Sequence, residues 1–179
     1  MASEMLHTEA SVPDCIVSTS DAKFQRVAGE ATYPAGAPSD TMDLIDASSF
    51  PPRIVATVAV SASIVGPPQA VAISPDGRLA VVSAPDRRDA ERGECVFERF
   101  LQVIDLSARP PRVVQRIPVA HHPQGVAFHP AGHLLLAATV GGTIESFAVT
   151  GQQLSHLQTL VVSSGRLAGV TFTPDGTAA

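Results

Sequence analysis

The fold of this chain is decided by a nine-residue stretch that occurs three times: QAVAISPDG at residues 69–77, QGVAFHPAG at 124–132 and AGVTFTPDG at 168–176. In each copy, side chains alternate between the two faces with a period of two, which is typical of a β-strand. The Pro-x-Gly that follows predicts a tight turn, because proline presets φ and glycine accepts a positive φ. The chain is therefore built from repeated strand–turn units.

A second pair of segments repeats independently. MDLIDAS at 42–48, followed by PPRIV at 51–55, matches LQVIDLS at 101–107, followed by PPRVV at 110–114. The segment CIVS at 15–18 similarly matches AVVS at 80–83. Four short strands are predicted in each unit: 69–74, 79–84, 99–105 and 112–119 in one, and 124–129, 134–139, 143–149 and 154–162 in the next. Units of about 40–45 residues with four strands are typical of β-propeller blades.

We therefore predict an all-β fold, a single partial β-propeller over residues 1–179. Its blades of four antiparallel strands are expected at about 12–60, 66–119 and 121–162, with the start of another at 165–179. Segments 21–41 and 85–98 are polar and rich in Gly, Pro or charge, so we expect mobile surface loops there. A ring needs about four blades to close, so this one is incomplete. The chain is a fragment of a longer propeller, a subunit completed by other copies, or a stable open arc.

Composition limits the partners. The 179 residues carry 12 Lys and Arg against 17 Asp and Glu, a formal charge of −5, which argues against nucleic acid and anionic membranes. No apolar run is long enough for membrane insertion, and the first residues do not form a secretory signal. Exposed blade faces predict self-association. Whether Cys15 and Cys95 pair, and which compartment holds the chain, stay open.

Residues 122–132, HPQGVAFHPAG, resemble the P-x-G-V-A-x-x-P-D-G opening of the YVTN-type propeller repeat. Residues 101–107, LQVIDLS, are similar to the third-strand segment V-x-V-I-D of that family, and the resemblance extends to the seven-bladed lactonase-like propellers. Ala131 stands where the family pattern has Asp. The resemblance implies a bacterial-type propeller, often exported, with a surface for a ligand or partner at the mouth of the central channel. Some relatives act on lactones.

Candidate binding residues come from the links between successive blades. In a propeller, the link from a fourth strand to the next first strand lies at the mouth of the channel, and the repeat places residues 66–69, 121–124 and 165–168 there. The candidates are Gln69, His121, His122, Gln124 and Arg166. Arginine binds carboxylate or phosphate as a bidentate fork, and histidine serves as an acid or base. The alternative is that these are variable loop residues facing water.

No catalytic residue, metal or cofactor is predicted. The sequence lacks a G-x-S-x-G elbow, a P-loop and a Rossmann glycine fingerprint. His129 and His133 flank a turn without the further ligands that a metal needs. Asp46 and Asp105 occupy equivalent positions and are expected to cap turns.

Two functions are therefore open. The preferred one is a non-enzymatic propeller segment that binds a protein or small ligand, as part of a longer binding scaffold. The alternative is a fragment of a lactonase-like hydrolase acting on a sugar lactone or a related cyclic ester. In that case His122 and Arg166 would polarise the lactone carbonyl and guide water.

Overall fold

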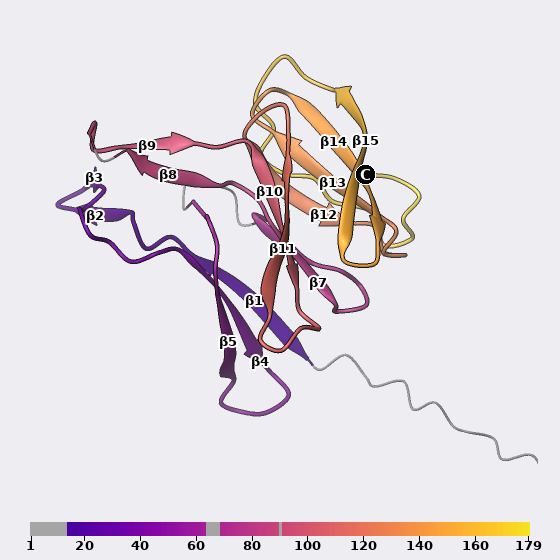
Figure 1. Cartoon of the computed structure of the whole chain (residues 1–179). Coiled ribbons are helices and arrows are strands. Elements are labelled where there is room, and N and C mark those ends of the chain that lie inside the picture. The colour runs from indigo at the N-terminus through magenta and orange to yellow at the C-terminus, as the bar shows by residue number, and fades with distance from the viewer. Residues whose placement is uncertain (1–13, 64–68, 90) are drawn as a thin grey trace, which may run out of the picture.

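The computed structural model describes residues 14–63, 69–89 and 91–179, and within these ranges every regular element is a β-strand. No helix able to cross a membrane occurs in this part of the chain. The strands form three main antiparallel sheets and two small hairpins (Figure 1). The prediction of an all-β fold with propeller-type blades in an incomplete ring is confirmed.

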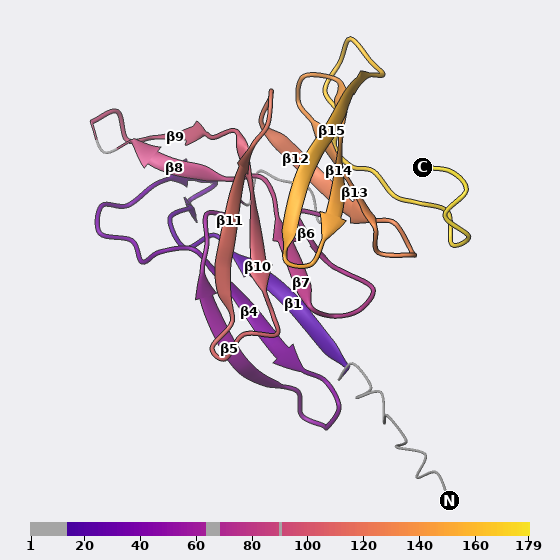
Figure 2. The same ribbon diagram turned by 45° about the vertical axis from the view of Figure 1, so that its right-hand side comes forward.

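We name the three main sheets blades 1 to 3. Blade 1 has three strands in the order β1-β4-β5: β1 Cys15–Ser20, β4 Thr41–Asp46 and β5 Arg53–Ala59. Blade 2 has the order β11-β10-β7-β6: β6 Val71–Ile73, β7 Leu79–Val82, β10 Phe100–Asp105 and β11 Arg112–Pro118. Blade 3 has the order β12-β13-β14-β15: β12 Pro123–Phe128, β13 Leu134–Thr139, β14 Thr143–Thr150 and β15 Gln153–Val161. Figure 2 shows the blades fanning out side by side.

Two apolar cores lie between the blades. In β7, the run from Leu79 to Val82 is fully buried, and its side chains alternate between two partners. Leu79 and Val81 join the core shared with blade 3, whereas Ala80 and Val82 join the core shared with blade 1. A continuous apolar run is expected of a strand covered on both faces, because its period-2 alternation then supplies both cores.

One end of each blade, which we call the turn end, carries the short repeat turns. Ser74 N–H donates to Leu79 O, His129 N–H to Leu134 O and Thr173 N–H to Ala178 O, at 2.9, 2.8 and 2.9 Å. The same turn thus forms in all three copies of the nine-residue stretch. Asp46 Oδ1 accepts from Ser48 N–H at 2.9 Å, and Asp105 Oδ1 accepts from Ser107 N–H at 2.9 Å. The predicted capping role of these two aspartates is confirmed.

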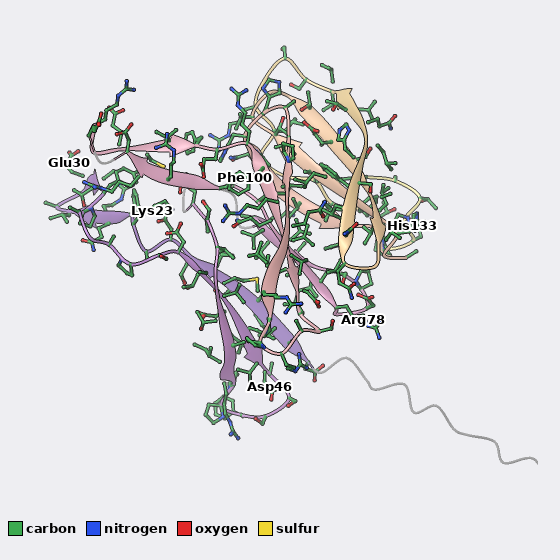
Figure 3. All side chains as sticks on the ribbon, viewed as in Figure 1. Lys23, Glu30, Asp46, Arg78, Phe100 and His133 are labelled. Atoms are coloured by element: carbon green, nitrogen blue, oxygen red, sulfur yellow. The ribbon has the colours of Figure 1, made fainter. Side chains whose placement is uncertain are left out.

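The opposite end, which we call the mouth end, carries the longer connections. Residues 21–41 form the hairpin of β2 (Gln25–Val27) and β3 (Glu30–Thr32), and residues 85–98 form that of β8 (Asp86–Asp89) and β9 (Glu94–Phe97). In Figure 3, Lys23 and Phe100 lie at this end, while Asp46 and Arg78 lie at the turn end. Both segments expected to be loops thus contain paired strands, and buried ionic contacts anchor their roots to the blades. Their mobility stays a prediction.

Two further expectations need correction. Residues 165–174 do not form a strand, since they have no ladder of backbone hydrogen bonds to a neighbouring strand among the described residues. The match of residues 15–18 to 80–83 is also displaced by one residue. Ile16 lies opposite Ile45 in blade 1, and Ala80 lies opposite Ile104 in blade 2, so Ile16 is the equivalent of Ala80. A slip of one residue exchanges the two faces of a strand.

Candidate binding surface at the mouth end

The three copies of the nine-residue stretch begin next to one another at the mouth end. Gln69 O accepts a hydrogen bond from Val126 N–H at 2.9 Å, and Ala168 O accepts one from Gly125 N–H at 3.0 Å. A Cβ added at Gly125 would lie 2.7 Å from Gly169 Cα, so the close approach of these backbones requires glycine. Residues 66–68 of the first predicted link lie outside the described residues.

The structure joins Gln124 and Arg166. Gln124 is only 2% exposed, and its Oε1 accepts a hydrogen bond from Arg166 Nη2 at 2.5 Å. Two contacts from blade 2 fix the start of β12: Ser83 Oγ–H donates to Gln124 O, and Ala84 N–H donates to Pro123 O at 3.1 Å. The exposed Arg166 is thus held by a buried amide, with its remaining N–H donors available at the surface.

Gln69 lies beside this pair. Its side-chain oxygen approaches the position of a Cβ at Gly125 to 3.2 Å and approaches that of a Cβ at Gly169 more closely still. Gln69 itself is exposed. Three of the five candidates, Gln69, Gln124 and Arg166, are therefore gathered at the convergence of three link segments.

His122 is buried, with 5% of its surface exposed, and its ring centroid lies 4.6 Å from that of Phe97. Nδ1 lies 2.8 Å from the backbone oxygen of Glu98. Because a carbonyl oxygen can only accept, Nδ1 carries the proton and Nε2 presents a lone pair. No described residue hydrogen-bonds Nε2. Burial lowers the pKa of His122, and the charge of Arg166 lowers it further, against the Glu98 carbonyl and Asp86, which raise it.

His121 is placed differently. It is half-buried, and its ring packs against Gly141 in the turn between β13 and β14, where a Cβ would collide with it. No hydrogen bond links His121 to another described residue. The adjacent histidines therefore point into different surroundings, and the structure does not bring His121 to Arg166 and Gln124.

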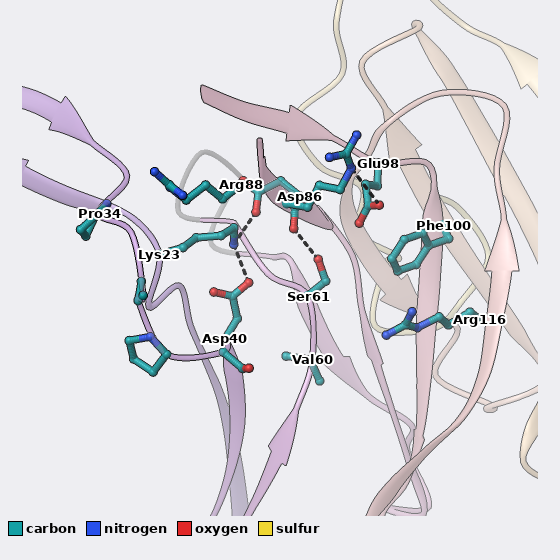
Figure 4. Close-up of a pocket in the computed structure, with 15 residues that line it drawn as sticks. Lys23, Pro34, Asp40, Val60, Ser61, Asp86, Arg88, Glu98, Phe100 and Arg116 are labelled. Atoms are coloured by element: carbon teal, nitrogen blue, oxygen red, sulfur yellow. Dashed lines mark hydrogen bonds and ion pairs between the residues drawn. The ribbon is translucent and has the colours of Figure 1, made fainter. Parts of the chain in front are cut away.

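A buried ionic cluster between blades 1 and 2 was missed by the sequence analysis (Figure 4). Lys23 Nζ lies 2.5 Å from Asp40 Oδ2 and 3.2 Å from Asp21 Oδ1, forms an ion pair with Asp86 Oδ1, and donates to Ala62 O at 2.5 Å. Burial alone would lower the pKa of Lys23, but Asp40 and Asp86 outweigh it and raise that pKa above its ordinary value. Lys23 therefore stays charged and serves as a link between blades.

Cys95 belongs to the edge of this ionic cluster. Its Sγ donates to Asp86 Oδ2 at 2.7 Å. Burial first, and then the hydrogen bond and charge of Asp86, raise the pKa of Cys95 to about 12. A thiol with such a pKa is protonated at neutral pH and is a poor nucleophile. Cys15 and Cys95 are both free thiols.

A pocket of about 370 Å³ opens beside the ionic cluster. Its wall includes Phe100, with the guanidinium of Arg116 5.2 Å from the ring centroid, and the pair of Arg87 Nε and Glu98 Oε1 at 3.8 Å (Figure 4). The described residues contain no group of three or more His, Cys, Asp and Glu side chains arranged to hold a metal. The Lys23 ammonium instead occupies the space between its carboxylates.

A signal for the ionic cluster is present in the sequence. Asp21 and Lys23 stand where the first insertion leaves β1, Asp40 stands where it rejoins β4, and Asp86 begins the second insertion. Charged residues at the roots of an insertion, rather than at its tip, are the pattern that could have indicated anchoring.

No family model and no curated protein matches this sequence. Among solved structures, the chain is similar to hydrazine synthase of Kuenenia stuttgartiensis, with a TM-score of 0.55 and 19% identity over 82% of this chain and 49% of that one. It is also similar to a candidate 6-phosphogluconolactonase of Bacteroides fragilis, with a TM-score of 0.52 and 17% identity over 70% of this chain and 34% of that one. The chain thus spans about half or less of these structures. The likeness supports a propeller-like fold.

Proposed function

We propose that this chain is a YVTN- or lactonase-like propeller segment that acts as a binding module, and that its mouth end binds a protein or small ligand through an anionic group. The observation that carries this proposal is the contact between Arg166 and the buried Gln124, at 2.5 Å. It holds an exposed guanidinium at the point where three link segments converge. Carboxylate and phosphate are the groups that such a fork binds best.

His122 supports binding more than catalysis. Its lowered pKa favours the neutral ring, whose Nε2 is a buried acceptor without a hydrogen-bond partner among the described residues. A general base is usually oriented by a carboxylate or has a pKa near the working pH. The structure holds Nδ1 with a backbone carbonyl instead, and no described carboxylate hydrogen-bonds this ring.

A hydrolase is the second candidate. The likeness to a candidate 6-phosphogluconolactonase and the presence of His122 and Arg166 at one end favour it. In this role Arg166 would polarise the lactone carbonyl and His122 Nε2 would guide the attacking water.

The binding proposal is tested by isothermal titration of the purified chain with phosphate, citrate and a phosphorylated sugar acid. We expect at least one of them to bind. Arg166→Gln should weaken its affinity about tenfold, the loss of roughly one charge-assisted hydrogen bond. Arg53→Gln, an exposed arginine at the turn end, is the matched control and should bind as the wild type does. Equal weakening in both variants, or no binding of any of the three ligands, contradicts the proposal.

The hydrolase is tested separately by the release of acid from 6-phosphogluconolactone. We expect the rate to equal that of buffer. Turnover above buffer that is lost in both His122→Asn and Arg166→Gln would replace the binding module with the hydrolase.

A further inference from the structure

Among the described residues, blade 1 has no counterpart of the strand that lies innermost in the other two blades. Blades 2 and 3 have four strands, whereas blade 1 ends at β1. Within the described ranges, β1 pairs only with β4, so its second edge presents unpaired N–H and C=O groups. An open edge of this kind is a template for another strand.

A groove of about 360 Å³ runs beside that edge. It is lined by residues 14–16 at the start of β1 and by Ile73, Ser74, Pro75 and Gly77, at the end of β6 and in the turn that follows. Ile16 is 50% exposed, although its equivalents Ala80 and Leu135 are fully buried where they face the preceding blade. The groove therefore marks the place that an additional strand would cover, and Ile16 marks the face that the blade carrying this strand would cover.

The chain carries a segment of the required kind at its other end. Residues 168–176 are the third copy of the innermost-strand stretch, and their turn is already formed, with Gly176 N–H donating to Thr173 O at 2.9 Å. The segment lies against β12, where His129 Nε2 is 3.1 Å from Gly176 O. It has no strand partner among the described residues. Among the described residues, β1 thus has no innermost strand beside it, and the segment 168–176 has the innermost-strand sequence without a strand partner.

We propose that the open edge of β1 binds residues 168–174 of a second copy of this chain, which complete blade 1 as its innermost strand. The register follows from the repeat. Ile73 lies opposite Ala80 and Phe128 opposite Leu135, so Phe172 of one copy lies opposite Ile16 of the other. Backbone hydrogen bonds supply the affinity, as in other cases of β-strand addition. This assembly goes beyond the proposed binding function and does not depend on it.

Two copies of this chain bring together a number of blades that propellers have. Pairing of residues 168–174 with β1 of the same chain would close a ring of three blades, whereas propellers have about four to eight. Reciprocal exchange between two copies gives six blades and a closed, two-fold symmetric assembly.

Residues 177–179 compete with β1 of the second copy for this pairing. Thr173 N–H donates to Ala178 O in this structure, in the place where Leu79 O accepts from Ser74 N–H in blade 2. Cys15 is the equivalent of Leu79, since it lies opposite Asp46 as Leu79 lies opposite Asp105. Residues 177–179 therefore occupy the position of Cys15 in the composite blade and have to leave it. Their deletion should strengthen the association.

The register is tested with two chains, both carrying Cys15→Ser and Cys95→Ser. One carries Ile16→Cys and the other Phe172→Cys. The equivalent pair in blade 2, Ile73 and Ala80, is flanked by the hydrogen-bonded pair Ser74–Leu79, so it is of the non-hydrogen-bonded type, with Cα atoms about 4.5 Å apart. That spacing suits a disulfide. We expect a disulfide-linked dimer on a non-reducing gel only when the two chains are mixed and oxidised.

Thr171→Cys replaces Phe172→Cys in the matched control, because its side chain points to the other face of the strand, and it should not cross-link to Ile16→Cys. Light scattering of the wild-type chain at about 100 μM should give twice the monomer mass. A chain lacking residues 165–179 should be monomeric, with its β circular dichroism retained. A monomeric wild type, a dimer that survives this truncation, or equal cross-linking by Thr171→Cys overturns the proposal.

Discussion

Aspartates have different roles at the turn end and at the mouth end of the blades. At the turn end, Asp105 and Asp76 accept hydrogen bonds from side chains two residues away: Ser107 Oγ–H donates to Asp105 at 2.6 Å, and Ser74 Oγ–H donates to Asp76 at 2.5 Å. At the mouth end, Asp40 and Asp86 are buried and both bind Lys23, Asp40 within blade 1 and Asp86 across the boundary between blades 1 and 2.

The difference separates local from shared stabilisation. A carboxylate at the turn end shapes one turn of one blade and stays near water. Buried carboxylates at the mouth end join two blades, so a substitution there affects both. Binding residues are also most often placed on connections held by a rigid framework. The mouth end therefore has both the long connections and the anchoring that a binding surface needs.

The largest effect should come from Lys23→Met, which breaks the shared ionic cluster. The substitution leaves Asp40 and Asp86, whose side chains are 6% and 1% exposed, without their cation. Breaking a buried ion pair in this way costs about 3–5 kcal/mol of unfolding free energy. Guanidinium chloride unfolding followed by circular dichroism measures the loss. Asp46→Ala at the turn end is the comparison, and a loss as large as that of Lys23→Met would contradict the distinction between the ends.

A smaller effect is expected for Gln102→Ala. Gln102 on β10 is fully buried, its Oε1 accepts from Ser61 N–H at 3.0 Å, and its Nε2 donates to Ser61 O at 2.7 Å. The substitution leaves these backbone groups unpaired between blades 1 and 2, which costs about 2 kcal/mol. Gln115→Ala is the matched control, because Gln115 makes the same two bonds to Leu154 from the less buried β11. Urea unfolding should show the smaller loss for Gln115→Ala; the reverse order would argue against burial as the cause.

The smallest effect concerns pH at the turn end. The Ser107 hydroxyl and the Ser107 and Ala108 N–H groups hold the pKa of Asp105 below its usual value. A lowered pKa in the folded state gives stability that is present above about pH 4 and is lost as the pH falls through the folded pKa. After solvent screening this amounts to about 0.5 kcal/mol. The difference in unfolding free energy between wild type and Asp105→Asn should therefore shrink from pH 6 to pH 3, and a constant difference would rule out this titration.

Local sequence pattern was sufficient to predict the strands and turns of the blades. The strands of blades 2 and 3, the tight turns and the capping by Asp46 and Asp105 all depend on residues within a few positions of one another, so a single repeat unit reveals them. The match of residues 15–18 to 80–83 was wrong by one residue because a short apolar run fits another apolar run almost equally well in either register. Only the pairing of Ile16 with Ile45 decides it.

The mouth end was less predictable for a different physical reason. The links between successive blades, compared across the repeat, did indicate Gln124 and Arg166, whose side chains are in contact. The environment of His122 depends on Glu98 and Phe97, and that of Lys23 depends on Asp86, from segments far apart in the sequence. Such contacts arise from the packing of one blade on the next and leave no periodic pattern.

The Lys23 cluster has a consequence for how the chain folds. Blades with nearly the same turns and core residues are interchangeable partners during folding, and wrongly paired neighbours are a characteristic failure of repeat proteins. The ammonium of Lys23 from blade 1 is satisfied by Asp86 at the edge of blade 2, and blade 3 has no insertion at the corresponding place, between β13 and β14. A wrong pairing of blade 1 with blade 3 would therefore leave the buried ammonium of Lys23 without Asp86, so the cluster favours the correct neighbour.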